Sequence, residues 1–307
     1  MVNVGILDAD TPLAGEIIRI LIHHPETDLS ALISPSLLGR SASSFHHGLI
    51  GEQPLNFTDK LNLEDLDILI LPRVTSLSES IINKASNYEN LRLILVSDET
   101  IKNSPENFEP GVSEVNRKAL VRGARYAYIP SPVIVPALIA LVPLGRYLLL
   151  NSDIEIEVTL PADMTDKIDP RIEAQRIEDL IKLVQNSFVG KVNLVIVGQN
   201  DSERGLRSHI TLKTNLPVDE IEKIYEESYD DHNFTFITGN ELSEGEVEGT
   251  HKHIMRLTKP EPEILTIESV ADARMRGGAG ETVHVLNLFF GLHEKTGLEL
   301  KPARFLS

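Results

Sequence analysis

The chain has 307 residues, of which 41% are hydrophobic, and its formal net charge is −17. This length predicts two domains with sizeable cores, and so acidic a surface excludes nucleic acid and anionic membrane from the expected partners. The chain contains no cysteine, which excludes disulfides, thiolate metal sites and any mechanism through a cysteine thioester.

The first half of the chain predicts alternating strands and helices. Apolar residues at Val2–Leu7 indicate a buried strand, and Pro12 suits the first turn of a helix that Asp10 or Thr11 can cap. Such alternation is typical of a parallel sheet with right-handed crossovers. The other strands predicted in this half are Leu29–Ile33, Leu66–Leu71, Leu91–Val96 and Tyr126–Ile129, and a helix is predicted at Ala137–Leu144.

The second half predicts mostly strands, with a domain boundary near Gly145. Polar and apolar residues alternate from Asp153 to Leu160, as in a half-exposed strand, and the whole pattern predicts an α+β domain with a mixed or antiparallel sheet. A glycine-rich turn at Gly277–Gly280 leads into a last helix at Thr282–Gly291. The remaining predictions are strands at Val192–Val197, Ser208–Thr214, Phe234–Thr238, His253–Leu257 and Ile264–Ser269, and helices at Ile172–Gln185 and Pro217–Ser228.

The apolar segments also bear on where the protein acts. No basic segment precedes the first apolar run, which is unlike a secretory leader. The longest apolar stretch, Val133 to Leu144, is too short to span a bilayer and contains two prolines. We therefore expect a soluble, cytoplasmic protein with no membrane partner.

Several short sequence motifs occur along the chain in the same order as in one known family. They are Val4-Gly5-Ile6 with Gly15–Leu21, Ala31–Ser36, Ser113–Arg117, Arg204-Gly205-Leu206, Val247–Thr250, Asp272–Asn287 and Phe290–Leu298. In this order, over nearly the whole chain, they resemble the N-acetyl-gamma-glutamyl-phosphate reductases, relatives of aspartate-semialdehyde dehydrogenase. The resemblance implies an α/β Rossmann-like N-terminal domain at residues 1–144, joined by a C-terminal helix at 278–307. It also implies an α+β semialdehyde-dehydrogenase-type dimerisation domain at residues 145–277.

The same resemblance implies an activity and its partners. In the family, NADPH reduces an acyl phosphate to a semialdehyde in arginine biosynthesis. A cysteine thiolate displaces phosphate to form a thioester, hydride transfer releases the aldehyde, and a histidine serves as general acid and base. The resemblance further implies a homo-oligomer, dimer or tetramer, or a hetero-oligomer with an active paralogue, and no metal.

The cofactor positions of the family can be carried over residue by residue. The glycines of its phosphate turn correspond to Asp8, Thr11 and Ala14, so that Asp8 and Asp10 stand where phosphates would lie. Like charges at about 4 Å cost roughly 1 to 4 kcal/mol, against about 0.3–1 kcal/mol from a helix dipole. The turn is therefore predicted to cap a helix rather than to hold phosphate, which puts NADP binding in question. The family's cofactor contacts fall on Thr11, Leu13, Ser34, Ser36, Arg40 and Gly278.

Both catalytic positions of the family carry residues without the required chemistry. The cysteine position falls on Pro132 and the histidine position on Ile168. Ser131 lies beside the first, but a serine needs a positioned base, so we interpret it as a turn residue. We interpret the chain as a catalytically inactive relative. Two alternatives stay open: a semialdehyde-dehydrogenase-like oxidoreductase that uses non-thiol chemistry, and a binder of another small ligand in the cleft between the domains.

The histidines suggest one further constellation. His251 and His253 are two residues apart on a predicted strand, so their rings would share a face. A metal would need a third ligand, and none is obvious nearby in the sequence. We therefore expect a solvated strand face there and no metal site.

Overall fold

The computed structural model describes residues 1–96, 108–199 and 202–302, and the chain divides into two compact units. The first unit contains Met1–Pro130 and Gly278–Glu299, and the second contains Ser131–Gly277 with the described residues from Leu300. Each unit is built around its own sheet. The first sheet is parallel and the second is mixed, as the alternation and composition of the two halves predict.

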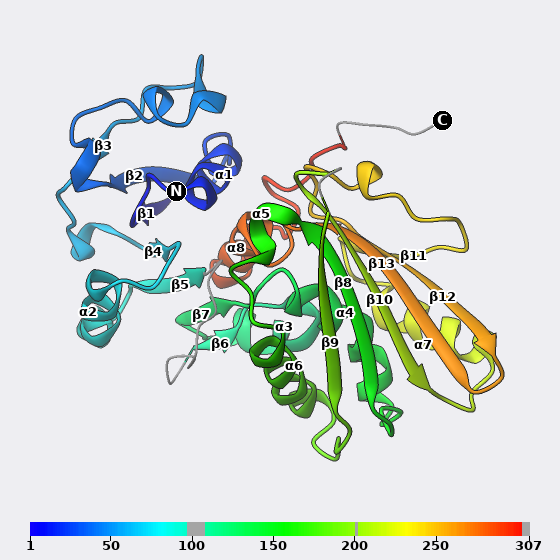
Figure 1. Cartoon of the computed structure of the whole chain (residues 1–307). Coiled ribbons are helices and arrows are strands. Elements are labelled where there is room, and N and C mark those ends of the chain that lie inside the picture. Colours follow the sequence, from blue (N-terminus) through cyan, green and yellow to red (C-terminus); the bar gives the residue numbers. More distant parts are fainter. Residues whose placement is uncertain (97–107, 200–201, 303–307) are drawn as a thin grey trace. The chain divides into compact units, whose positions relative to one another are not determined.

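The described strands of the first unit form one parallel sheet in the order β3-β2-β1-β4-β5-β7-β6 (Figure 1). Both faces of its centre are covered, and all four residues of β4 are buried, which is typical of parallel sheets. The order reverses at β1, because β2 lies on one side of it and β4 on the other. The strands are β1 Val2–Ile6, β2 Thr27–Ile33, β3 Phe57–Thr58, β4 Ile68–Leu71, β5 Arg92–Val96, β6 Glu109–Pro110 and β7 Tyr126–Ile129.

The helices of the first unit include one from the far end of the chain. Helix α8 packs against α1 and α3 and against strands β5 and β7. Its buried residues run along its whole length, which explains the apolar character of this segment. The helices are α1 Pro12–Leu21, α2 Ser76–Lys84, α3 Ser113–Arg122 and α8 Ala279–Phe289.

The segment after α8 is held to that helix by Glu294. Its Oε2 lies 3.1 Å from Nε2 of the buried His284, and its Oε1 accepts hydrogen bonds from Arg117 of α3. Asn287 adds a bond from its amide to the carbonyl of Glu294. The hydrogen bond with His284, followed by the bond from Arg117, lowers the pKa of Glu294 to about 2.

This lowered pKa predicts an acid-sensitive contribution to stability. A carboxyl whose pKa is lower in the folded than in the unfolded protein stabilises the fold above the unfolded pKa, and loses that effect as the pH falls through the folded pKa. Glu294→Gln is therefore expected to flatten the loss of stability between pH 4.5 and about 2. Urea denaturation across this range measures it. Glu64→Gln, at an exposed position, is the control, and an unchanged slope in Glu294→Gln would contradict the prediction.

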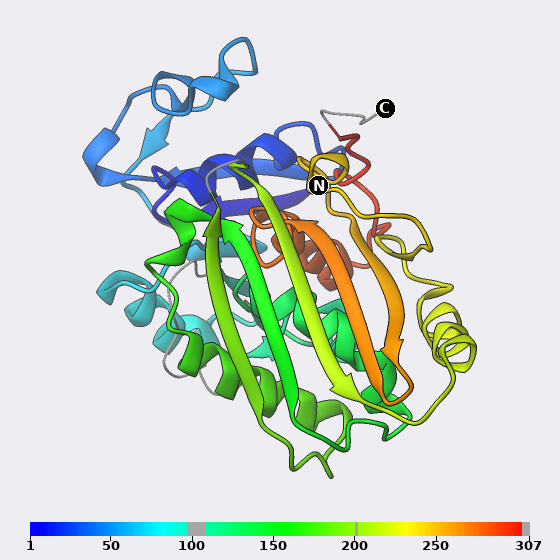
Figure 2. The ribbon, with the colours of Figure 1, turned by 45° about the vertical axis from the view of Figure 1, so that its right-hand side comes forward.

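The described strands of the second unit form a mixed sheet in the order β11-β12-β13-β10-β8-β9, with helices α4, α6 and α7 along one face (Figures 1 and 2). The pairs β8–β9 and β11–β12 are parallel, and the other neighbours are antiparallel. The strands are β8 Ile154–Pro161, β9 Val192–Gln199, β10 Gly205–Lys213, β11 Thr235–Ile237, β12 His253–Glu261 and β13 Ile264–Asp272. The helices are α4 Ile134–Arg146, α5 Ala162–Thr165, α6 Pro170–Val184 and α7 Val218–Tyr229.

Helix α4 forms the core of the second unit. It is buried from Ile134 to Gly145 and packs against α6, α7 and the sheet. Pro143 has no N–H, so the carbonyl of Ile139, one turn earlier, loses its usual helical donor. The hydroxyl of Tyr229 in α7 donates to that carbonyl instead. The proline is thus tolerated because a neighbouring helix supplies the missing hydrogen bond.

The division of the chain differs from the predicted boundary after residue 144. The segment Ser131–Leu144 groups with the second unit, because α4 is buried against α6 and α7 there. The residues from Leu300 also group with the second unit rather than with α8, and residues 303–307 of the predicted C-terminal segment lie outside the described part. A change of composition does not reveal which sheet covers a buried helix. Among the described residues, no helix is both long and apolar enough to cross a membrane.

Candidate functional site

The turn between β1 and α1 lies at the carboxyl ends of β1 and β4, where the strand order reverses. In open parallel sheets, ligands bind at this switch point. Asp8 and Arg73, each two residues beyond its strand, form an ion pair there, with Nη2 of Arg73 2.8 Å from Oδ1 of Asp8. Asp8 has a φ of +48°, a left-handed conformation that favours glycine and that aspartate tolerates better than most residues.

The start of α1 is capped by its own residues. Thr11 is the N-cap, and its Oγ1 accepts a hydrogen bond from the amide of Ala14, in agreement with one of the two predicted caps. His46 covers the first turn of the helix, since a Cβ built on Gly15 would lie 2.6 Å from its Nδ1. Nε2 of His46 is also 2.7 Å from the carbonyl oxygen of Ala9. The turn and the helix start are therefore closely packed.

The predicted serine contacts lie beside the same turn. Ser34 and Ser36 share a hydrogen bond, and Ser36 donates to Oδ2 of Asp10. Arg40 is exposed six residues beyond the buried Ser34, and Leu13 is half-buried in the first turn of α1. The structure thus brings Thr11 and the two serines to one edge of the sheet, together with two acidic side chains. Gly278 lies at the start of α8, where its carbonyl accepts a hydrogen bond from Thr282.

A second turn, in the second unit, carries Pro132, which stands at the position of the family's cysteine. Pro132 is buried directly before α4. Gly277, with a φ of +73°, packs its backbone onto this turn, since a Cβ at Gly277 would lie 2.5 Å from Cα of Pro132. The predicted histidine position, Ile168, is half-buried between α5 and α6. The two positions carry a pyrrolidine ring and a hydrocarbon chain, and neither group can move a proton or form a bond to a substrate.

Ser131 has a partner that the sequence did not reveal. Its Oγ donates a hydrogen bond to Oε2 of Glu173 on α6, and both side chains are buried. Burial raises the pKa of Glu173, although the bond from Ser131 and the nearby Arg176 oppose that shift. The serine at the start of α4 is thus hydrogen-bonded to a side chain of α6. The contact therefore ties the start of α4 to α6.

The segment that ends in Gly277 is fixed by the fully buried Asp272. Oδ2 of Asp272 lies 2.7 Å from Nε of Arg204 and accepts the amide of Gly249, while Oδ1 accepts the amides of Arg274 and Met275. These donors are backbone amides of the second unit and the guanidinium of Arg204. It holds the loop after β13 in place, in front of the turn that carries Pro132.

The two histidines of the predicted strand face are buried, so the expectation of a solvated face is wrong. His253 begins β12 on the same side as Met255 and Leu257, which are core residues. A two-residue spacing shows that two rings share a face but does not show which face is inside. His251 precedes the strand, and its ring lies edge-on to Phe234 with the centroids 4.8 Å apart.

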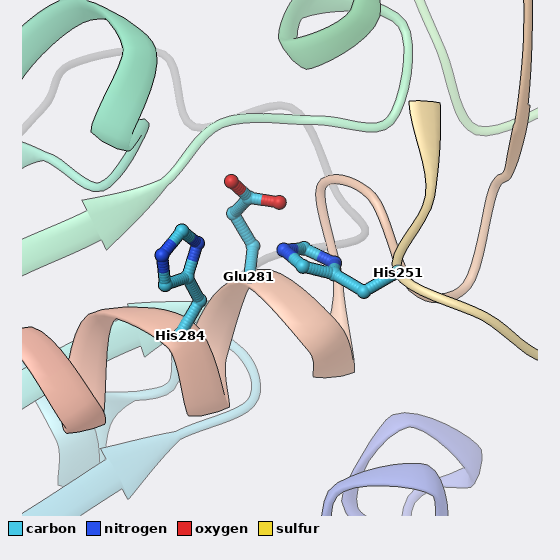
Figure 3. Close-up of side chains that lie close together, drawn as sticks. All are labelled: His251, Glu281 and His284. Carbon is cyan, nitrogen blue, oxygen red and sulfur yellow. The ribbon is translucent and has the colours of Figure 1, made fainter. Parts of the chain in front are cut away.

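Figure 3 draws His251, which belongs to the second unit, with two residues of the first. Glu281 and His284 are one turn apart on α8, and both are buried. His284 already bonds to Glu294 through its Nε2. Its role in the first unit is thus to hold the segment that follows α8.

Curated relatives match this chain over its full length, although no protein-family model matches it. The N-acetyl-gamma-glutamyl-phosphate reductase of Parabacteroides distasonis is 30% identical, with 99% of this chain and 100% of the relative covered. The enzyme of the same name from Christiangramia forsetii gives the same values, and that from Bacteroides thetaiotaomicron is 29% identical with the same coverage. The chain belongs to the N-acetyl-gamma-glutamyl-phosphate reductase family. The resemblance inferred from the motifs is confirmed.

Solved structures agree with the fold expected for this reductase family. Aspartate semialdehyde dehydrogenase II of Vibrio cholerae superposes with a TM-score of 0.73 at 14% identity, covering 95% of this chain and 98% of that one. The aspartate semialdehyde dehydrogenase of Candida albicans, solved with NADP, gives a TM-score of 0.68 at 12% identity, with 94% and 98% covered. At these identities the likeness shows the fold alone. The predicted fold class, a Rossmann-like region with a second α+β region, is confirmed.

Three contacts at these turns were not predicted from the sequence of this reductase-family chain. They join Asp8 to Arg73, Ser131 to Glu173, and Gly277 to Pro132. A signal existed for the first: both residues follow predicted strands, and adjacent parallel strands bring their carboxyl ends together. No local sequence pattern predicts the other two contacts, because each depends on how a helix or a loop packs on α4.

Proposed function

We propose that this chain is a non-catalytic member of the N-acetyl-gamma-glutamyl-phosphate reductase family that acts as a structural partner subunit. The observation that carries the proposal is the absence of cysteine from the sequence, with Pro132 at the position that the family resemblance assigns to the nucleophile. Reduction of an acyl phosphate through a thioester begins when a thiolate displaces phosphate from the acyl carbon. A proline ring offers no nucleophile, so no group at this position can displace the phosphate.

The remaining groups around Pro132 do not supply a substitute. Ile168, at the family's histidine position, cannot donate or accept a proton. Ser131 offers a hydroxyl, but it is buried, and it is held by a hydrogen bond to the buried Glu173 of α6. These features favour a non-catalytic role over an oxidoreductase that uses a serine in place of the thiol.

The open face of the second sheet supports a role as a subunit. Helices cover one face, while the side chains at alternate positions of β8, β9 and β10 point to the other and are exposed, as at Glu157, Val195 and His209. Val197 and Phe236 add exposed apolar surface on this sheet. A sheet face that mixes valines, an aromatic ring and charges of both signs suits pairing with a similar sheet. We propose a second copy of this chain or an active relative as the occupant.

A turnover assay tests the absence of catalysis. The purified chain and an active reductase of the family are incubated separately with NADPH and N-acetyl-gamma-glutamyl phosphate, and NADPH absorbance is followed. We expect consumption with the active enzyme and none above buffer with this chain. Turnover would overturn the proposal, and its loss in Ser131→Ala would assign the chemistry to the serine hydroxyl.

A separate measurement tests the role as a subunit. Native mass spectrometry of the chain, alone and co-expressed with an active reductase of the family, gives the mass of each assembly. A homo-oligomer or a mixed oligomer is expected, and Val195→Asp with Val197→Asp on the open sheet face is expected to dissociate it. A monomer in both preparations would contradict the proposal, even if no turnover is found.

A further inference from the structure

The turn at the switch point of the first unit allows the family cofactor to be tested against the residues present. A dinucleotide needs backbone N–H groups, a helix start and room for the close approach of a pyrophosphate. In this chain the amides of Leu7, Ala9 and Thr11 donate to the carbonyls of Ile70, Ile33 and Asp8. These three amides are therefore engaged by the sheet and by the turn itself.

The start of α1 also has few free N–H donors for a phosphate. Pro12, the first residue of α1, has no N–H, and the amide of Ala14 is taken by the side chain of Thr11. Two of the first three helical positions thus cannot donate to a ligand. Because a phosphate site at a helix start depends on these N–H groups as well as on the dipole, both contributions are reduced here.

Asp8 places an acceptor where the phosphate would need a donor. Its Oδ1 is engaged by Arg73, while its Oδ2 is buried and has no hydrogen-bond partner among the described residues. A carboxylate oxygen and a phosphate oxygen are both acceptors, so neither can satisfy the other. A phosphate at this turn would add a like charge beside Oδ2 and would compete with Asp8 for Arg73.

The acidic character extends toward the second strand. Ser34, Ser36 and Asp10 form a chain of hydrogen bonds that ends on Oδ2 of Asp10. The two serines that the family resemblance assigns to the cofactor are thus oriented toward a carboxylate of their own chain. Both ends of the turn carry negative charge, and the cation Arg73 is already paired with one of them.

We propose that this turn excludes dinucleotide phosphates, and that Asp8 and Asp10 are the residues responsible. The residues present do not fit NADP, so the first unit keeps the sheet of a dinucleotide-binding domain without its ligand. This inference rests on the turn of the first unit and does not depend on the missing thiol, so either proposal can fail while the other stands.

The test is calorimetric titration of the full chain with NADPH and with NADH. No binding is expected for the natural chain at millimolar cofactor. Asp8→Gly with Asp10→Gly places glycine at the left-handed position and removes both charges, so we expect measurable binding with a dissociation constant at least tenfold below the limit set by the natural chain, equivalent to about 1.4 kcal/mol. Asp8→Asn keeps the shape and the backbone preference and removes only one charge, and we expect a smaller gain. Asp59→Asn, an exposed change of equal charge in the same unit, should change nothing.

Circular dichroism of each variant confirms that it is folded. Micromolar binding to the natural chain would overturn the proposal directly. If neither the double variant nor Asp8→Asn gains affinity while both are folded, the carboxylates are not what excludes the cofactor, and the proposal also fails. A gain in Asp59→Asn as large as that in Asp8→Asn would assign the effect to net charge rather than to this turn.

Discussion

Replacement of Asp272 by alanine is expected to lower the free energy of unfolding of the second unit by about 3–5 kcal/mol, because it leaves a partly buried guanidinium and several amides without their acceptor. The carboxylate is fully buried, pairs with Arg204 at 2.7 Å and accepts the amides of Gly249, Arg274 and Met275. Urea denaturation followed by circular dichroism measures the effect, since the chain has no tryptophan for fluorescence.

The matched control for this prediction is Asp163→Ala. Asp163 also pairs with an arginine, Arg274, at 3.0 Å, but its side chain is 63% exposed. Exposed pairs contribute about 0–1 kcal/mol, so the control should stay close to the natural chain. Equal effects of the two substitutions would mean that Asp272 does not anchor the loop after β13.

Replacement of Gly277 by alanine is expected to destabilise the same unit by about 2–5 kcal/mol. The positive φ of +73° costs a residue with a Cβ about 1–2 kcal/mol. The added methyl group would also lie 2.5 Å from both N and Cα of Pro132. These are backbone atoms that cannot rotate away, so the loop or the start of α4 must shift, at a cost of about 1–3 kcal/mol.

Gly249→Ala separates the two causes. Gly249 has nearly the same φ, +77°, but nothing lies within 4 Å of its ideal Cβ. Only the conformational cost should appear there, so Gly277→Ala should be the more destabilising by about 1–3 kcal/mol. If both variants lose the same stability in denaturation experiments, the close approach to Pro132 makes no contribution.

The family motif at the end of β13 contributes to the packing of the second unit. Part of the motif is retained in this chain, including Gly277, although the chain has no cysteine thiol. Asp272 and Gly277 account for its retention through packing, because they hold the loop and the turn before α4. Persistence of the motif therefore supports the family relationship and is equally compatible with a non-catalytic protein.

The sequence by itself predicted the family and the fold class, and it excludes any mechanism through a cysteine thiol. The strand at Val2–Leu7 was predicted because a buried strand of a parallel sheet is apolar along its length, and a cap at Asp10 or Thr11 because both side chains suit a helix start. The absence of cysteine needs no structure at all. The two-residue strands β3 and β6 were missed, since so short a segment has no period to detect.

Only the tertiary structure decided what surrounds each turn. Asp8 meets Arg73 across 65 residues of sequence and Ser131 meets Glu173 across 42, because strand order and helix packing bring them together. Likewise, α4 joined the second unit through its burial against α6 and α7. Local patterns report which side of an element is apolar, whereas these contacts depend on which elements become neighbours, and that is settled by the packing of the whole unit.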